Sequence, residues 1–312
     1  MISKPDYFKS AKEAYTEMFA SYRLSDIQLK SLQQCLLSML KDFKRICDEH
    51  GIAYMLGYGT LLGAVRHQGF IPWDDDIDVM MLREEFEKFR QVFDEERREG
   101  RLDDYLLAIP AESENYYFKI PKLYKKGTVY ETVSYMGNPE YNMVPLDIFI
   151  VEKIPQNAFV RYARGLVYTF AYYASSFCLD HLYPSPAIRE ESRKNRKLRS
   201  YYRFRNFWGV VFSCLGGIGF YLKICDRLGR YSGKTKLRGI PSDVSYFHIT
   251  YPAEMFIERT QTDFCGLMAD IPKQYDRFLA DEFGDYMKLP PEDKREVHVA
   301  YRLLVDPFGE NA

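Results

Sequence analysis

The feature that most constrains this chain is a run of four aspartates in the five positions 74–78, just before an apolar segment. Carboxylates this close repel one another, and no basic residue separates them. If the run leads into a β-strand, residues two apart share a face, so Asp76 and Asp78 point together and Asp74 can join them. The run is therefore either a solvated acidic turn or a site that holds a cation such as a metal ion.

A further carboxylate, Asp147, lies in the middle of the strongly apolar stretch 143–151 (MVPLDIFIV). An aspartate is costly to bury in such a strand unless something compensates its charge. It either caps a loop or pairs with an arginine, or it joins Asp76 and Asp78 from a neighbouring strand. The second arrangement would form an all-oxygen site suited to Mg²⁺ or Mn²⁺, which favour carboxylate and phosphate oxygens.

Composition narrows the class of protein. The chain has 312 residues, 46% of them hydrophobic, which is enough for a substantial core in one large or two modest domains. A net charge of -1 predicts neither a nucleic-acid binder nor an acidic disordered chain. The six cysteines lack metal-ligand spacing and the first residues lack an apolar signal segment, so we expect reduced thiols and a cytoplasmic location.

Hydrophobic spacing predicts an α/β first part. Ser25 and Gln28 form a capping box for a helix over 25–50, and apolar residues at helical spacing predict another over 83–98. A short helix is expected to begin at Thr60. Strands are expected at 52–56, 105–109, 116–123, 128–134 and 143–151.

After about residue 152 the pattern becomes mostly helical, and 272–283 is its best-marked helix, with Pro272 in the first turn. We therefore expect an α+β fold with two parts. Residues 1–151 would form a catalytic core of mixed sheet and helices, and residues 152–312 a mostly helical region packed on it.

The segment 189–222 combines charge with apolarity. Eight arginines and lysines lie within 189–205, and the sixteen residues 207–222 carry no charge. That apolar length is below the roughly 20 residues that span a bilayer. We expect a solvated basic helix followed by a buried one; the alternative is peripheral contact of 189–222 with an anionic membrane surface.

Residues 59–78, GTLLGAVRHQGFIPWDDDID, are similar to the signature of the LicD family of phosphorylcholine transferases. Residues 121–128 (PKLYKKGT), 145–149 (PLDIF) and 271–298 resemble further segments of that family. The resemblance covers roughly 25–150 and 250–300. It implies a nucleotidyltransferase-like mixed sheet.

The resemblance also implies a reaction. Family members transfer an alcohol phosphate, such as phosphocholine, from a CDP-activated donor to a hydroxyl of a cell-surface glycan or its lipid-linked precursor, and release CMP. We expect this at the inner face of the membrane. Donors other than CDP-choline stay open, because the sequence shows no aromatic cage for choline.

The positions that match the family's motifs indicate which residues would form the site. Asp76 and Asp78 would ligate Mg²⁺ or Mn²⁺, with Asp74 as a further ligand. Asp147 would complete the site and accept the proton of the attacking hydroxyl. The expected substrate-binding residues are Gly59, Thr60, Arg66, His67, Trp73 and Lys122.

Each of these substrate-binding assignments has a plain structural alternative. Arg66 could pair with an aspartate, His67 could cap its helix, and Lys122 could be exposed. Trp73 could stack a cytosine, face a quaternary ammonium or anchor the loop. Gly59 and Thr60 could form only a tight turn. His298 lies at the position of the family's closing histidine and has no assignable role.

Two other functions compete. A true nucleotidyltransferase would use the same site residues but transfer a nucleoside monophosphate and release pyrophosphate. A non-catalytic protein bound to membrane or glycan would use the basic segment, with the acidic run holding a structural cation. The length of the signature favours the transferase.

Overall fold

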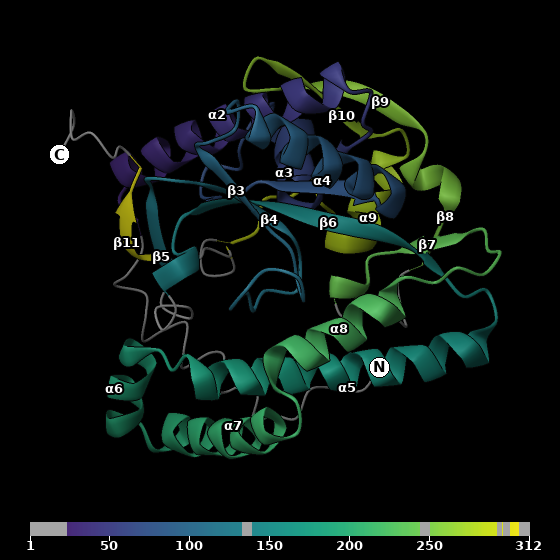
Figure 1. Cartoon of the computed structure of the whole chain (residues 1–312). Coiled ribbons are helices and arrows are strands. Elements are labelled where there is room, and N and C mark those ends of the chain that lie inside the picture. The colour runs from purple at the N-terminus through teal and green to yellow at the C-terminus, as the bar shows by residue number, and fades with distance from the viewer. Residues whose placement is uncertain (1–23, 133–138, 244–249, 292–294, 296–299, 306–312) are drawn as a thin grey trace.

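The computed structural model describes residues 24–132, 139–243, 250–291, 295 and 300–305 (Figure 1). A mixed seven-stranded sheet forms its centre. Five strands follow one another across it in the order β1-β2-β6-β4-β3. Their bounds are β1 Met55–Leu56, β2 Asp78–Leu82, β6 Val144–Ile154, β4 Lys122–Lys125 and β3 Tyr105–Ala108.

Strands β2 and β6 form the middle of this sheet and run parallel, whereas the other pairs are antiparallel. Both are strongly apolar, as expected of strands covered on both faces. The far end of β6 pairs with β7 (Leu237–Gly239), which pairs with β8 (Tyr251–Pro252). The expected mixed sheet is therefore confirmed.

The two helices best marked in the sequence are confirmed. Helix α2 (Asp26–Glu49) begins at the capping box of Ser25 and Gln28, and its buried stripe includes Leu36 and Phe43. Helix α4 (Arg83–Arg98) buries the three phenylalanines of its apolar stripe. In Figure 1 these helices lie with α3 (Tyr58–His67) above the sheet, while α5 to α8 lie below it.

The layer below the sheet consists of four helices: α5 (Ala158–Leu182), α6 (Pro186–Lys194), α7 (Arg196–Cys214) and α8 (Gly217–Gly229). Helix α5 packs against both α7 and α8, and α8 reaches β6. The expected helical character of the C-terminal half holds for this layer.

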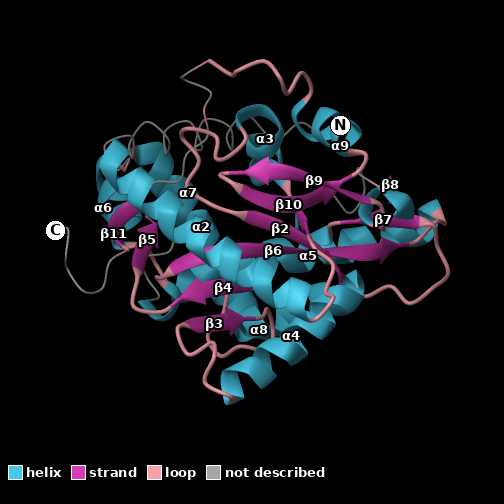
Figure 2. Ribbon diagram, turned by 90° about the horizontal axis from the view of Figure 1, so that it is seen from above, coloured by secondary structure: helices cyan, strands magenta, loops and turns pink. Residues whose placement is uncertain are grey.

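Beyond Gly229 that expectation is wrong, because strands follow. Besides β7 and β8, the chain forms the hairpin β9 (Arg259–Phe264) and β10 (Leu267–Pro272), seen from above in Figure 2. Cys265 and Gly266 both have positive φ, the backbone of a two-residue hairpin turn. Pro272 therefore ends a strand, and the predicted helix begins only at Tyr275.

A second expectation, that the apolar stretch 207–222 forms a buried helix, is also wrong. The stretch is split between α7 and α8, which meet at a bend of 80°. Phe207 and Leu215 are 61% and 66% exposed. Among the described helices, none is by itself long and apolar enough to cross a membrane, although α7 and α8 together meet that criterion.

Candidate active site

The parallel pairing of β2 and β6 places Asp78 and Asp147 opposite each other in register. Lys122 of β4 is the antiparallel partner of Asp147 on its other side. The Lys122 Nζ atom lies 2.8 Å from Asp147 Oδ2, and both side chains are largely buried. Asp147 therefore comes from the strand beside Asp78, as expected, and Lys122 is part of the site rather than an exposed lysine.

Asp78 lies deep in this site and is only 8% exposed. Burial raises the pKa of its carboxyl well above the usual range, and the charges of Asp76, Asp147 and Asp74 raise it further. Lys122 acts in the opposite sense. The four carboxylates predicted from sequence therefore lie close enough to influence one another.

The acidic run itself forms a tight group. One carboxylate oxygen from each of Asp74, Asp75 and Asp76 lies within 4.8 Å of the others. Asp75, which sequence reasoning did not select, is buried and accepts a 2.8 Å hydrogen bond from the Tyr130 hydroxyl. No signal in the sequence links these two residues, because the contact joins the acidic run to a distant strand, β5 (Val129–Thr132).

The first turn of α3 receives one of these carboxylates. A Cβ atom added at Gly59 would lie only 3.0 Å from Asp74 Oδ2, so the glycine admits that side chain. Gly57, the residue before the helix, provides no side-chain cap. The dipole of α3 stabilises a negative charge near its N-terminus, such as the Asp74 carboxylate. Whether Gly59 also admits a phosphate stays a prediction.

Thr60 is buried and acts on the site through the backbone. Its Oγ1 accepts a 2.8 Å hydrogen bond from the Asp78 N–H group. The contact fixes the start of β2, and with it the position of the Asp78 carboxylate. A direct contact of Thr60 with substrate stays a prediction.

The Thr60 contact can be tested by substitution. We expect Thr60→Val, which keeps the volume but removes the acceptor, to lower the free energy of unfolding by about 1–3 kcal/mol, because a buried N–H group loses its partner. Thr60→Ser keeps the hydroxyl and serves as the control. Urea unfolding of the two variants would contradict this role if Ser cost as much as Val.

Arg66 and His67 are held elsewhere. They lie in the last turn of α3, whereas Gly59 and Thr60 lie in its first turn, about 10 Å away along the axis. The Arg66 guanidinium donates to the Tyr286 carbonyl at 2.6 Å and to His67 Nε2 at 3.0 Å. Burial and then the Arg66 charge lower the pKa of His67. Among the described residues, neither side chain has a hydrogen bond or ion pair with the carboxylates.

Trp73 is half-buried beside the acidic run, and the Arg295 guanidinium lies 4.2 Å from its ring centroid. One face of the indole thus already meets a cation from the C-terminal part of the chain. Arg295 is a neighbour that the sequence did not indicate. His298 lies outside the described residues.

The donor set fits a hard divalent cation. All its side chains are carboxylates, the ligands that Mg²⁺ and Mn²⁺ favour. Asp147 Oδ1 is buried and accepts no hydrogen bond from the described residues. A buried carboxylate oxygen without a donor is costly, and a bound cation would compensate it.

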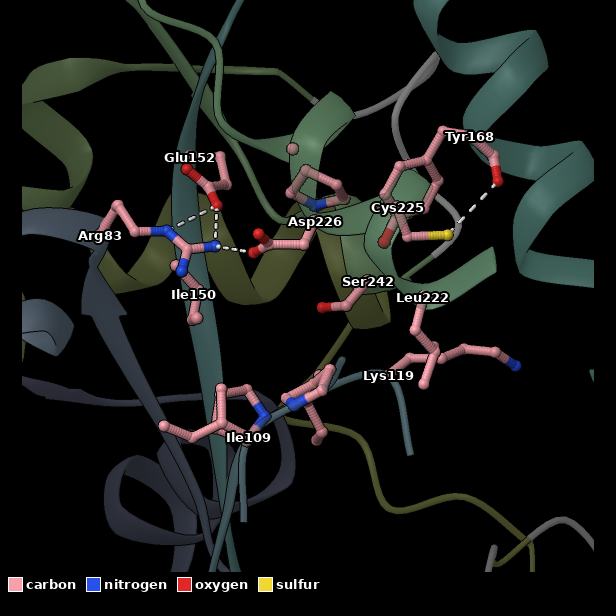
Figure 3. Close-up of a pocket in the computed structure, with 15 residues that line it drawn as sticks. Arg83, Ile109, Lys119, Ile150, Glu152, Tyr168, Leu222, Cys225, Asp226 and Ser242 are labelled. Atoms are coloured by element: carbon pink, nitrogen blue, oxygen red, sulfur yellow. Dashed lines mark hydrogen bonds and ion pairs between the residues drawn. The ribbon is translucent and has the colours of Figure 1, made fainter. Parts of the chain in front are cut away.

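A small cavity lies on the other side of β6, away from these carboxylates. Its volume is about 50 Å³, and its lining includes Arg83, Glu152, Asp226 and Lys119 (Figure 3). Ligand pockets typically hold several hundred Å³. The cavity is a gap around a network of ion pairs, and none of the predicted site residues lines it.

Comparison with known proteins finds a family match over the part of the chain that holds these residues. Residues 51–157 match the family model described as LicD/FKTN/FKRP, nucleotidyltransferase domain. This match includes the acidic run, Lys122 and Asp147. It excludes the helical layer from α5 onward.

Three curated relatives are similar to the chain. The lipopolysaccharide cholinephosphotransferase LicD of Haemophilus influenzae is 28% identical over 276 residues, which cover 88% of this chain and 97% of that protein. Uncharacterized proteins of Rickettsia typhi and Rickettsia prowazekii are 39% and 40% identical over about a quarter of each chain. Residues 51–157 of this chain therefore resemble the nucleotidyltransferase domain of the LicD family, and the similarity to a LicD protein extends over nearly the whole of that protein.

Proposed function

We propose that this protein transfers phosphocholine, or another phospho-alcohol, from a CDP-activated donor to a hydroxyl of a glycan or its lipid-linked precursor, releasing CMP. The class of reaction is supported by the similarity to the Haemophilus influenzae relative, which is named a lipopolysaccharide cholinephosphotransferase. Within the chain we assign the chemistry to residues up to 151 and contact with the acceptor to the region from 152.

The observation that carries the proposal is the position of Asp78. It is buried, lies in register with Asp147 across the parallel strands, and feels the charges of Asp76 and Asp74. Such repulsion is unfavourable unless a ligand relieves it. A metal-bound diphosphate is such a ligand, because its cation would be coordinated by these carboxylates.

We infer that Mg²⁺ or Mn²⁺ is held by Asp76, Asp78 and Asp147, with Asp74 contributing. When bound, the cation supplies positive charge that neutralises the diphosphate of the donor. As in nucleotidyltransferases, we expect catalysis to depend mainly on positioning of the reactants and on electrostatic stabilisation of the transferred phosphate. Asp75 would help to fix the position of the acidic run, because it accepts a hydrogen bond from the Tyr130 hydroxyl.

The chain's own residues position the reactants. Lys122 lies beside Asp147 and can turn its ammonium group toward a phosphate oxygen as a point charge. Asp147, oriented by Lys122, is the proposed acceptor of the proton from the attacking hydroxyl. The half-buried Trp73, which lies beside the acidic run, is the proposed contact for the base or the alcohol of the donor.

The test is a product assay with the full chain. CDP-choline, CDP-glycerol, CDP-ribitol and CTP are each incubated with a lipopolysaccharide acceptor, with Mg²⁺, Mn²⁺ or EDTA. We expect CMP from one CDP-alcohol and a matching increase in acceptor mass, both abolished by EDTA. Pyrophosphate from CTP would instead indicate a nucleotidyltransferase. No product from any donor would contradict an enzymatic function with these substrates.

Lys122 provides a second check on this function. We expect Lys122→Met to raise KM for the CDP-alcohol about tenfold, because a charge-assisted phosphate contact is lost. Lys122→Arg should recover part of the loss. Lys126→Met removes a lysine, close in sequence, whose ammonium group donates to the Asp103 carbonyl, and it should have no effect. Unchanged steady-state kinetics in Lys122→Met would contradict a role for this lysine in donor binding.

A further inference from the structure

The outward face of α7 changes from basic to apolar halfway along the helix. Exposed residues recur at spacings of three and four and therefore share this face. In order they are Arg196, Arg199, Arg203, Phe207, Val210 and Cys214. A helix that faces only water carries polar residues throughout its exposed side. The second half of this face is therefore suited to an apolar neighbour.

Aromatic contacts continue the apolar area from α7 onto α5. The Trp208 ring lies 5.6 Å from both Phe207 and Phe212, and Phe212 lies 5.7 Å from Phe170 of α5. Phe170 is itself 56% exposed. Figure 1 shows α5 and α7 side by side, on the side of the molecule away from α2, α3 and α4.

The bend between α7 and α8 adds further exposed apolar side chains, so that one surface extends over three helices. Six of its exposed members, which we call the apolar helical face, are Leu166, Phe170, Phe207, Val210, Leu215 and Phe220. Large contiguous apolar surfaces on a folded protein mark contact with another molecule or with lipid.

The basic end of α7 forms a pocket with α6. The pocket has a volume of about 520 Å³ and is lined by six residues, four of them arginines. These residues are Arg189, Ser192, Arg193, Arg199, Tyr202 and Arg203. Arg199 is fixed by a 3.0 Å hydrogen bond from its Nε to the Ser192 carbonyl. Several guanidinium groups around one space suit a phosphate group.

We propose that α6, α7 and the bend before α8 dock on an anionic membrane surface. The apolar helical face enters the boundary between headgroups and acyl chains, and the arginine pocket binds lipid phosphates. Charge selects this partner: a membrane surface supplies the negative charge that the arginines require, whereas a second copy of the chain would bring arginines of its own. The docking does not depend on the reaction proposed above.

The geometry of α7 and α8 favours a position at the membrane interface over one that spans the bilayer. Among the helices that the structure describes, the bent pair of α7 and α8 is apolar over a sufficient length only when the two are taken together. The arginines at one end of α7 stay among the headgroups, while Phe207 and Trp208 lie where aromatic side chains prefer the interface. This arrangement would hold the protein at the surface that carries lipid-linked acceptors.

Trp208 makes the docking measurable. The chain has two tryptophans, so Trp73→Phe leaves Trp208 as the single tryptophan, whose emission is excited selectively at wavelengths that tyrosine does not absorb. We expect its emission to shift to shorter wavelength with vesicles of phosphatidylglycerol and phosphatidylcholine, and to stay unchanged with phosphatidylcholine alone. In co-sedimentation with the same vesicles, Phe207→Glu should lower the partition coefficient at least about tenfold.

The charged end is tested with Arg193→Ser combined with Arg203→Ser. Each arginine near an anionic surface contributes about fivefold to binding, so removal of the pair should lower partitioning about 25-fold at low salt. Ile257→Glu is the matched control, because Ile257 is 57% exposed but lies outside the apolar helical face. Circular dichroism checks that each variant is folded.

Two outcomes would overturn the docking proposal. One is equal vesicle binding by the Phe207→Glu and Ile257→Glu proteins. The other is a dimer in sedimentation velocity that Phe207→Glu dissociates, with no shift of Trp208 emission on vesicles. The second outcome would assign the apolar helical face to contact between copies of the chain.

Discussion

The Asp78→Asn protein should fold like the unsubstituted chain but lose about 1000-fold in phospho-alcohol transfer. Asparagine has nearly the same shape, and the Asp78 N–H bond to Thr60 does not involve the side chain. The loss follows because an amide cannot replace a carboxylate that helps to hold a divalent cation. Transfer is measured as CMP release from the CDP-alcohol identified by the product assay.

The thermal midpoint separates this functional loss from damage to the fold. Without added metal, Asp78 is buried among the charges of Asp76, Asp147 and Asp74, so its replacement should not lower the midpoint. With Mg²⁺ or Mn²⁺, the unsubstituted chain should gain stability that the variant lacks, because a ligand that binds only the folded state stabilises it. Full activity in Asp78→Asn would contradict the assigned site.

Glu258→Gln is the control for this experiment. Its carboxylate is half-exposed and pairs with Lys273 at the surface, far along the chain from the acidic run. Removing that charge should change neither CMP release nor the response to metal. A loss in both variants would point to a general effect of lowering the negative charge.

The second large effect is on stability. Arg83→Met should lower the free energy of unfolding by about 3–5 kcal/mol at neutral pH, because it leaves a buried carboxylate unpaired. Arg83 donates to Glu152 Oε1 from Nε at 2.9 Å, and its NH2 group lies 3.3 Å from Asp226 of α8 (Figure 3). These bonds join α4, β6 and the helical layer. Urea unfolding measures the loss.

The pH dependence of this loss has a definite sign. Burial raises the pKa of Glu152, and Arg83 partly opposes the rise. Without Arg83 the pKa rises further. Since a raised carboxyl pKa means that the folded state binds the proton more tightly, stability is regained as the pH falls through that pKa. The difference between Arg83→Met and the unsubstituted chain should therefore shrink from pH 7 toward pH 5.

Two further variants control for the removal of charge. Arg90→Met breaks ion pairs with Glu87 and Glu112 that are nearer to solvent and should cost less than about 1 kcal/mol. Arg83→Met combined with Glu152→Met removes both buried charges and should recover much of the loss. A loss in Arg83→Met that grows as the pH falls would contradict the unpaired carboxylate as its cause.

Local features of the fold were predictable because their causes lie within a few residues. The capping box at Ser25 and the phenylalanine stripe of α4 are formed by neighbours in sequence, and both were confirmed. The apolar strand around Asp147 was predicted for the same reason. The Cys265–Gly266 turn was also a local signal, but the strong helical pattern nearby led to a helix prediction that began too early.

What the sequence determined by itself is the LicD signature, the acidic run and an apolar strand with one carboxylate. Tertiary structure alone decided that β6 lies parallel to β2, which sets Asp147 beside Asp78, and that Lys122 completes the pair. It also turned Arg66 toward Tyr286 and left the apolar second half of α7 exposed. The physical reason is that local hydrogen bonds and periodicity act within a helix or strand, whereas the partner of a side chain depends on how distant elements pack.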